Sequence, residues 1–213
     1  MPRVTHLLRR ASKSIQDLDL LKVLESELNH ELSSIRFQGC GIGSSGDFIL
    51  EWDSPWSQDV VLRKKGSAGE EVAVSALLGR EAFQGDSTFP REALMKICVK
   101  KAGLNSILHF DCVASSIGED RSDFDIRKAQ YIQSISCLDS SVYRGPIFSD
   151  LDPTLQRELK QFLASRGVDE NFTNFVLLHL HRKEQDQYMN WLQKLKDSMD
   201  DEDMCNDQCS KKR

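Results

Sequence analysis

Histidines that are close together in the sequence are the first residues of this chain to consider for chemistry. His179 and His181 are two residues apart in a segment with helical periodicity. Side chains at this spacing point to different faces of a helix, and a pair of metal ligands needs a step of three or four residues. We therefore expect packed or solvated histidines here, and no metal site.

Two cysteines in strand-like segments are candidates for a nucleophilic thiol. His109 and Asp111 share one face of a predicted strand, and Cys112 is on the opposite face. Cys112 is therefore predicted to be a small core residue and not part of a Cys/His pair. Cys98 is on the more polar face of its strand between two lysines, which could lower its pKa. A thiol enzyme that uses Cys98 or Cys112 thus stays open as one alternative.

Glycine-rich and acidic segments give no stronger catalytic signal. The run Gly39-Cys40-Gly41-Ile42-Gly43 follows a predicted helix and precedes a predicted strand, the reverse of a dinucleotide fingerprint, and it lacks the lysine of a phosphate loop. We interpret it as a linker. The carboxylate pairs at strand starts have no apolar pocket suggested around them and are predicted to form a solvated rim; they are Glu70 with Glu71, and Asp123 with Asp125. The sequence therefore predicts no catalytic residues and no cofactor.

Composition limits the classes of function. The chain has 213 residues, of which 28 are Lys or Arg and 33 are Asp or Glu, so its formal net charge is −5. This balance argues against binding of nucleic acid by the whole surface, and RNA is not indicated as a partner. With 39% hydrophobic and 29% charged residues the chain is typical of globular proteins, and no apolar run approaches the roughly 20 residues that span a bilayer. Six cysteines without C-x-x-C spacing favour a reducing compartment.

The two ends of the chain differ from the middle. Residues 1–16 contain four basic residues, two serines and no acid, with apolar residues at helical spacing, which is typical of an organelle transit peptide. The alternative is an exposed basic extension of the first helix. Residues 200–213 begin with four acidic residues and include Cys205 and Cys209, and we expect a disordered tail. A single domain is predicted for residues 17–199.

The elements between these ends fall into three zones. Residues 17–33 have the period of a helix, through Leu21, Leu24, Leu28 and Leu32. The middle zone has short alternating segments with short linkers and no helical segment, which predicts an antiparallel meander. Its predicted strands are residues 48–52, 59–64, 71–78, 95–99, 107–113, 123–126 and 131–136.

Two helices are predicted for the last zone. The first has Asp152 as its N-cap, Pro153 at its first position and Gly167 as its stop. The second starts at Asp169 and extends for about 28 residues, or roughly 40 Å at 1.5 Å per residue. It is longer than a sheet of this size needs as a cover, so part of its apolar stripe is expected to contact another subunit.

Several motifs resemble one protein family in order and spacing. They are Tyr143-Arg144-Gly145-Pro146-Ile147-Phe148, Leu151-Asp152-Pro153-Thr154-Leu155-Gln156, Leu163-Ala164-Ser165-Arg166-Gly167-Val168 and Lys183-Glu184-Gln185-Asp186-Gln187-Tyr188-Met189-Asn190-Trp191-Leu192. They are similar to the mitochondrial acidic matrix protein family, also called the mitochondrial glycoprotein family, whose animal members include a protein that binds the globular heads of a complement component. The run Asp19-Leu20-Leu21-Lys22-Val23-Leu24-Glu25-Ser26-Glu27 resembles its plant branch. The similarity extends from about Leu18 to Met199.

The resemblance implies an α+β fold with one N-terminal helix, a strongly twisted antiparallel sheet of about seven strands and two C-terminal helices. It also implies a doughnut-shaped homotrimer in which the terminal helices help to build the subunit contacts. The residues expected at this helix-packing interface are Leu21, Leu24, Leu28, Tyr188, Trp191, Leu192 and Leu195.

The function implied by the resemblance is that of a non-catalytic, multivalent acidic binding or chaperone-like protein of the mitochondrial matrix. Its expected partners are basic proteins, such as mitochondrial ribosomal or respiratory-chain factors, through which it supports translation or oxidative phosphorylation. This chain departs from the strongly acidic members, because the segments 79–91 and 118–128, expected to be loops, mix both signs of charge. An alternative function is a helix-grip carrier, in which the last helix encloses an apolar ligand against the sheet.

Overall fold

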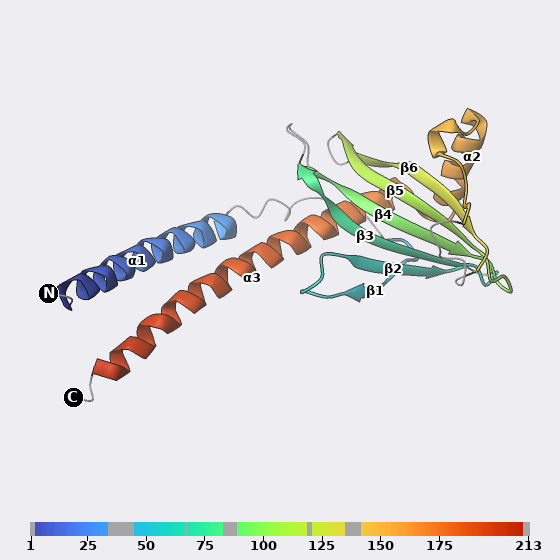
Figure 1. Ribbon diagram of the computed structural model, residues 1–213. Helices are drawn as coiled ribbons and strands as arrows, with labels where there is room; N and C mark the ends of the chain where they lie inside the picture. The colour runs from blue at the N-terminus through green and yellow to red at the C-terminus, as the bar shows by residue number, and fades with distance from the viewer. Residues whose placement is uncertain are drawn as a thin grey trace. The chain divides into compact units, whose positions relative to one another are not determined.

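The computed structural model describes residues 3–33, 45–66, 68–82, 89–118, 121–134 and 142–210. Within these residues it contains three α-helices, six strands and a one-turn 3-10 helix (Figure 1). In chain order the elements are α1 (Arg3–Ser33), β1 (Ile49–Asp53), β2 (Val60–Lys65), β3 (Glu71–Ala82), β4 (Arg91–Lys100), β5 (Ile107–Gly118), β6 (Arg121–Ile132), η2 (Phe148–Asp150), α2 (Pro153–Ala164) and α3 (Glu170–Ser210).

The chain divides into two compact units. The sheet unit is Gly39–Glu184 and holds the six strands, η2, α2 and the first part of α3. The helix unit combines Met1–Gln38 with Gln185–Arg213, and so holds α1 and the remainder of α3.

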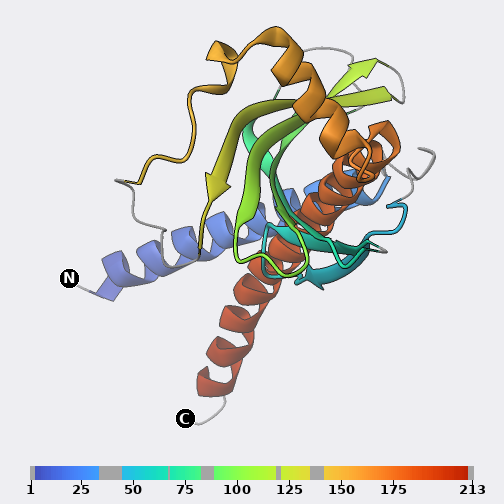
Figure 2. The ribbon, with the colours of Figure 1, turned by 90° about the vertical axis from the view of Figure 1, so that its right-hand side faces the viewer.

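The strands of the sheet unit follow one another in the order β1-β2-β3-β4-β5-β6, and every neighbouring pair is antiparallel. The predicted meander is therefore confirmed, and Figure 2 shows that the sheet is strongly curved. The expected number of about seven strands is corrected to six for the described residues. Residues 123–126 and 131–132 belong to one strand, β6, because the chain between them keeps its pairing with β5 through a bulge. Residues 135–136 lie outside the described part of the chain.

Two segments that were expected to be loops are partly strand. β3 continues to Ala82 and β4 starts at Arg91, so the strands extend into both ends of the segment 79–91. Likewise β6 starts at Arg121, so nearly all of the segment 118–128 is paired with β5. The charged residues at positions 121–128 therefore belong to a strand, whereas residues 83–88 and 119–120 lie outside the described part of the chain.

The core of the sheet unit is built by the alternating apolar positions of the strands. Leu62 pairs with Val74, Val74 with Ile97, and Ile97 with Phe110, which forms one row across four strands. These four side chains are at most 1% exposed. The residues of α2 and α3 that complete this core are buried as well; they are Leu163, Phe172, Val176, Leu177 and Leu180.

Local capping interactions fix the start and the end of α2. Asp152 accepts a hydrogen bond from the amide of Thr154, and Pro153 occupies the first helical position, as predicted. At the other end the amide of Gly167 donates to Ala164 and that of Val168 to Leu163, which is the Schellman arrangement. Gly167 has φ +91°, a value that favours glycine.

The two long helices extend beyond their expected bounds. α1 is continuous from Arg3 to Ser33 and therefore includes most of the basic N-terminal segment. The backbone of α3 continues to Ser210, through the acidic segment where we expected a disordered tail. Acidic residues do not stop a helix, and this segment has neither glycine nor proline to do so. Side chains before Leu18 and after Met199 lie outside the described set.

Candidate functional site

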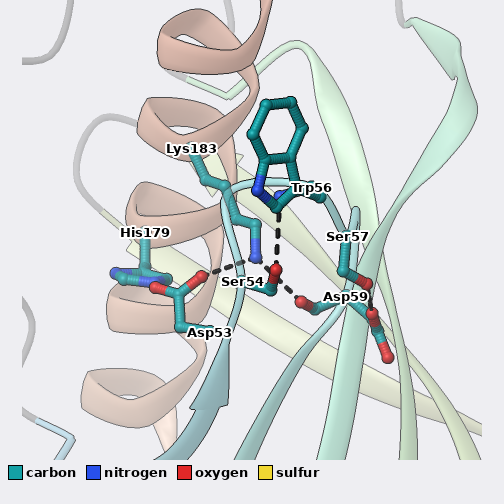
Figure 3. Close-up of polar contacts among 7 residues, drawn as sticks. All are labelled: Asp53, Ser54, Trp56, Ser57, Asp59, His179 and Lys183. Carbon is teal, nitrogen blue, oxygen red and sulfur yellow. Dashed lines mark hydrogen bonds and ion pairs between the residues drawn. The ribbon is translucent and has the colours of Figure 1, made fainter.

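A polar cluster connects the first part of α3 to the strand at one edge of the sheet (Figure 3). Lys183 is only 8% exposed, and its Nζ donates to Oδ1 of Asp53 at 2.5 Å and to the carbonyl oxygen of Asp59 at 2.9 Å. One turn earlier on α3, Nε2 of His179 is 2.8 Å from Oδ2 of Asp53. We call Asp53, His179 and Lys183 the α3 clasp.

The charges of the clasp keep Asp53 ionised. Burial opposes its ionisation, but hydrogen bonds and charge from Lys183 and His179 outweigh that effect, so the pKa of Asp53 lies below its ordinary value of 3.8. Lys183 is nearly buried, and its two acceptors among the described residues are the carboxylate of Asp53 and the carbonyl oxygen of Asp59, so Asp53 is the group that compensates its charge. The clasp therefore holds the end of β1 and the start of β2 against α3.

Large apolar side chains are exposed around the strand that the clasp holds. β1 is the first strand of the sheet, and all five of its residues are exposed. Trp52 is 54% exposed, and Trp56, in the turn to β2, is 79% exposed. Exposed tryptophans are enriched at binding sites for other proteins. This edge is therefore one candidate interaction surface.

The helix unit offers a second candidate surface. Leu24 and Leu192 are buried, Leu21, Leu28 and Leu195 are half-buried, and Tyr188 and Trp191 are exposed. The rings of Tyr188 and Trp191 are stacked, with their centroids 6.0 Å apart. These seven residues are the ones expected at the helix-packing interface.

Polar contacts join α1 to the last part of α3 beside these residues. The hydroxyl of Tyr188 donates to Glu27 at 3.0 Å, and this contact, with a smaller effect of desolvation, raises the pKa of Tyr188. Lys196 and Glu25 form an ion pair at 2.8 Å. Within one chain, the two helices therefore pack through leucines and polar rims, and the two aromatic rings are left exposed.

Comparison with known proteins identifies the family of the chain. The family model described as mitochondrial glycoprotein matches residues 63–199. The chain belongs to the mitochondrial glycoprotein family. The resemblance stated from the motifs is thus confirmed, and the matched residues include both β6 and most of α3.

Curated relatives of this mitochondrial glycoprotein family member are named as mitochondrial proteins. An uncharacterized mitochondrial protein of Arabidopsis thaliana is 29% identical over 192 residues, which cover 85% of this chain and 74% of the relative. The mitochondrial acidic protein mam33 of Schizosaccharomyces pombe is 31% identical over 131 residues, which cover 53% of this chain and 46% of that protein. Family and relatives are mitochondrial.

Solved structures share the fold. The crystal structure of the Trypanosoma brucei p22 protein aligns with a TM-score of 0.67 and 18% identity, covering 87% of this chain and 99% of that chain. A Leishmania major protein described as a sequence homologue of human p32 aligns with a TM-score of 0.65 and 18% identity, covering 86% and 99%. The family fold of one N-terminal helix, an antiparallel twisted sheet and two C-terminal helices is therefore confirmed.

The two histidines of α3 point to different faces, as predicted. His179 contacts Asp53, whereas His181 is buried, with Nδ1 2.7 Å from the carbonyl oxygen of Leu177 and Nε2 3.4 Å from the amide of Arg91. In this arrangement Nδ1 donates and Nε2 accepts, which requires a neutral ring. Burial, the largest effect, also lowers the pKa of His181. Within the described residues, no three metal-ligating side chains are grouped closely enough to hold an ion.

The environments of the two described cysteines, Cys98 and Cys112, do not activate a thiol. Cys112 is buried in the core, as predicted, and burial together with nearby acidic residues raises its pKa to about 12. The effect that the neighbouring lysines could have on Cys98 is outweighed, because burial and the charge of Asp111 raise its pKa more than Lys96 lowers it. Strand pairing places Cys98 opposite His109, a neighbour that the sequence did not reveal. With both thiols protonated, the thiol-enzyme alternative loses its basis.

The paired carboxylates are neutralised by cations on other elements. Glu70 accepts a hydrogen bond from Nη2 of Arg166 at 3.0 Å, Glu71 is 3.7 Å from Arg63, and Asp123 is 2.6 Å from Lys160. An acid–base dyad needs two carboxylates that share a proton in one site. Glu70 and Glu71 have separate cations, and Asp123 and Asp125 both lie near the ammonium group of Lys160, at 2.6 and 4.0 Å. The expected acidic rim is thus a set of ion pairs. The remaining candidate, Gly39-Cys40-Gly41-Ile42-Gly43, lies outside the described residues.

The α3 clasp was missed by sequence reasoning, although one signal was present. His179 and Lys183 are four residues apart on a helix and therefore share a face. Their acceptor, Asp53, is 130 residues away from Lys183 in the chain, and nothing in the local sequence connects them.

As for membranes, no helix in the described ranges is both long and apolar enough to span a bilayer.

Proposed function

We propose that the chain is a non-catalytic, homotrimeric binding protein of the mitochondrial matrix that engages basic partner proteins. Membership of the mitochondrial glycoprotein family supports the compartment, and the excess of acidic residues supports the class of partner. Through such partners the protein would support mitochondrial translation or oxidative phosphorylation.

The observation that carries the proposal is the number of large apolar side chains exposed on the helix unit. Leu18, Leu20, Val23 and Leu32 of α1 are exposed, in addition to Tyr188 and Trp191 of α3. A single chain buries Leu24 and Leu192 between its own two helices and leaves these six side chains in water. Exposed apolar surface of this extent is typical of subunit interfaces, where aromatic side chains carry much of the binding energy.

Charge supports the class of partner. Three copies with a net charge of −5 would carry about −15 together, which is enough to attract basic proteins over roughly 10 Å at 0.1 M salt. Several copies of the same surface in one ring would also bind an extended partner more tightly than a single copy.

Substitution of Trp191 tests the assembly. Trp191→Asp places a charge in the centre of the proposed subunit contact and should shift the molar mass in solution toward that of a monomer. Tyr143→Asp is the matched control, because Tyr143 is also an exposed aromatic residue but belongs to the sheet unit. A Trp191→Asp protein with the same mass and the same dissociation midpoint as the control would contradict the proposed contact.

Binding of basic probes tests the second half of the proposal. Polylysine should bind the assembled protein at low salt, and its affinity should fall steeply as the salt concentration rises. Polyglutamate of equal length is the control for charge. Equal affinity for both polymers, or no affinity for polylysine at low salt, would refute basic partners as the class.

The carrier alternative has less support. The face of the sheet toward α3 is formed by the row Leu62, Val74, Ile97 and Phe110, and the helix residues that complete this core are equally inaccessible. Phe48 contacts Phe172 with ring centroids 4.5 Å apart, and Phe110 contacts Phe162 at 6.2 Å. These contacts favour a packed core over a cavity that holds a ligand.

A further inference from the structure

The edge of the sheet formed by β6 is covered over only part of its length. β6 is the last strand, and the amide of Tyr131 donates to the carbonyl oxygen of Arg144 at 2.9 Å. Gly145 lies so close to β6 that a Cβ on it would be 2.8 Å from the carbonyl oxygen of Ala129. Residues 144–145 thus take the place of a neighbouring strand at this end. Next to them, at residues 125–127, the described part of the chain has no segment hydrogen-bonded to the outer edge.

A groove of about 570 Å³ opens at this uncovered part of the edge. It is bounded by β6, η2 and α2, and its apolar lining is formed by Ile126, Ile147, Phe148 and Pro153. Ile126 and Phe148 are buried, whereas Ile147 is exposed at the rim. The groove therefore combines an open strand edge with a place for one apolar side chain.

A bulge in β6 occurs at the groove. Lys128 pairs with Asp111 and Ile126 pairs with Cys112, so Arg127 has no residue opposite it in β5. Bulges change the direction of side chains on edge strands and are frequent beside binding sites. Arg127 lines the groove, and it forms no ion pair with the residues that the structure describes.

Two further cations and one carboxylate line the groove. The carboxylate is Asp125, which is 4.0 Å from Lys160, and the two cations differ in how strongly they are paired. Lys160 is 2.6 Å from a carboxylate oxygen of Asp123, so its charge is already compensated. Arg157 is 3.9 Å from Glu158, and both of these side chains are exposed, so water screens this contact. Arg157 and Arg127 therefore keep their guanidinium groups available for a ligand.

We propose that this groove binds a short extended peptide segment that carries acidic residues on both sides of an apolar one. Guanidinium groups bind carboxylates through two parallel hydrogen bonds, the lining accepts an apolar side chain, and the open edge of β6 pairs with the peptide backbone. Three residues of extended peptide span roughly 10 Å. The peptide backbone pairs with β6 at residues 125–127. This part of the edge lies next to the part that residues 144–145 cover.

This groove binds acidic segments, whereas the proposed acidic surface binds basic partners. Binding in the groove does not depend on trimer formation. An acidic segment is repelled by a chain with net charge −5 except where cations are concentrated. The groove is thus a second, chemically distinct binding site of the same protein.

Fluorescence anisotropy of the full chain with a labelled peptide tests the proposal. The probe is fluorescein-Gly-Asp-Leu-Glu-Gly-amide, and Gly-Lys-Leu-Lys-Gly with the same label is the charge control. Arg127→Gln and Arg157→Gln should each weaken the binding of the acidic peptide roughly tenfold, as expected for loss of one charged hydrogen-bonded contact. Arg80→Gln, which removes the same charge from an exposed position on β3, should leave the affinity unchanged.

Two further measurements complete the test. A probe with an N-methylated leucine cannot pair with β6 and should bind at least tenfold more weakly, and Ile147→Asp should remove binding altogether. Equal affinity of the N-methylated probe would overturn the strand pairing. Equal binding of the lysine peptide, an equal loss in Arg80→Gln, or displacement of the probe by inorganic phosphate at the same concentration as the acidic peptide would overturn the peptide site as a whole.

Discussion

Removal of the ammonium group of the α3 clasp should lower the free energy of unfolding by about 2 kcal/mol. Lys183→Met keeps most of the apolar stem but removes the donors to Asp53 and to the carbonyl oxygen of Asp59, at 2.5 and 2.9 Å. A hydrogen bond to a charged group contributes about 1.5–3 kcal/mol and one to a neutral carbonyl about 1 kcal/mol. The side chain of Asp53 is 27% exposed and keeps its contact with His179 in this variant. Water and the imidazole therefore replace part of the stabilisation that the carboxylate loses with the ammonium group.

Urea unfolding measures this loss, and a double-mutant cycle with Asp53→Asn isolates the contact. We expect a coupling free energy of about 1–2 kcal/mol between Lys183 and Asp53. Lys100→Met is the matched control, because Lys100 is exposed at the end of β4, and its loss should change stability by less than about 0.5 kcal/mol. A coupling energy near zero, or equal effects of the two lysine substitutions, would refute the clasp as the connection between β1 and α3.

The same contact gives a dependence on pH whose sign is fixed. The pKa of Asp53 in the folded state lies below its ordinary value of 3.8, so the ionised carboxylate stabilises the fold above that value. This contribution is lost as the pH falls through the lowered pKa. The difference in stability between the parent chain and Asp53→Asn should therefore be constant from pH 5 to 7 and shrink below about pH 4.

Three further predictions follow from burial and backbone geometry. Burial lowers the pKa of His181 from 6.5, so between pH 7 and 5 the unfolded chain binds a proton that the folded chain does not. The stability of the parent chain should therefore fall from pH 7 to 5, and the urea midpoint of His181→Gln should fall less over the same range. At pH 7.5, iodoacetamide should alkylate Cys98 slowly and Cys112 only after unfolding, and peptide mapping that finds rapid labelling of either would contradict their raised pKa values. Gly145→Ala should cost roughly 1–3 kcal/mol in urea unfolding, because its Cβ meets a carbonyl oxygen at 2.8 Å, and Gly103→Ala, at φ +73° with open space, should cost less.

Elements that depend on local chemistry were predictable from the sequence. The start of α2 is set by Asp152 and Pro153, and its end by Gly167, which all act within a few residues of the backbone groups they satisfy. The alternating strands were predictable because one face is buried against helices. The motif 143–148 also has a physical role, since Gly145 allows the chain to approach the edge of β6.

Features that depend on pairing between distant segments were not predictable. The contact of Cys98 with the strand of His109 requires the register of β4 against β5, and the α3 clasp joins residues 130 positions apart. The expected break in the last strand was wrong because a bulge at Arg127 absorbs one extra residue without ending the pairing. Sequence periodicity alone does not distinguish a bulge from a turn.

The seven residues predicted at the helix-packing interface illustrate both cases. Leu24 and Leu192 each belong to an apolar stripe with helical spacing, which predicts a buried face. Both side chains are buried within the helix unit. Whether Tyr188 and Trp191 become buried depends on a second copy of the chain, which the sequence of one chain does not specify. Their role between subunits therefore stays a prediction.

The molar mass in solution, measured by light scattering from low to high salt, tests the central claim most directly. A trimer of this chain has three times 24.2 kDa, or about 73 kDa. Because the proposed contacts are mainly apolar, we expect this mass to persist at 1 M salt, where charge interactions are screened beyond about 3 Å. A mass of 24.2 kDa at all salt concentrations would contradict the account, since the apolar side chains of the helix unit would then have no second copy to cover them.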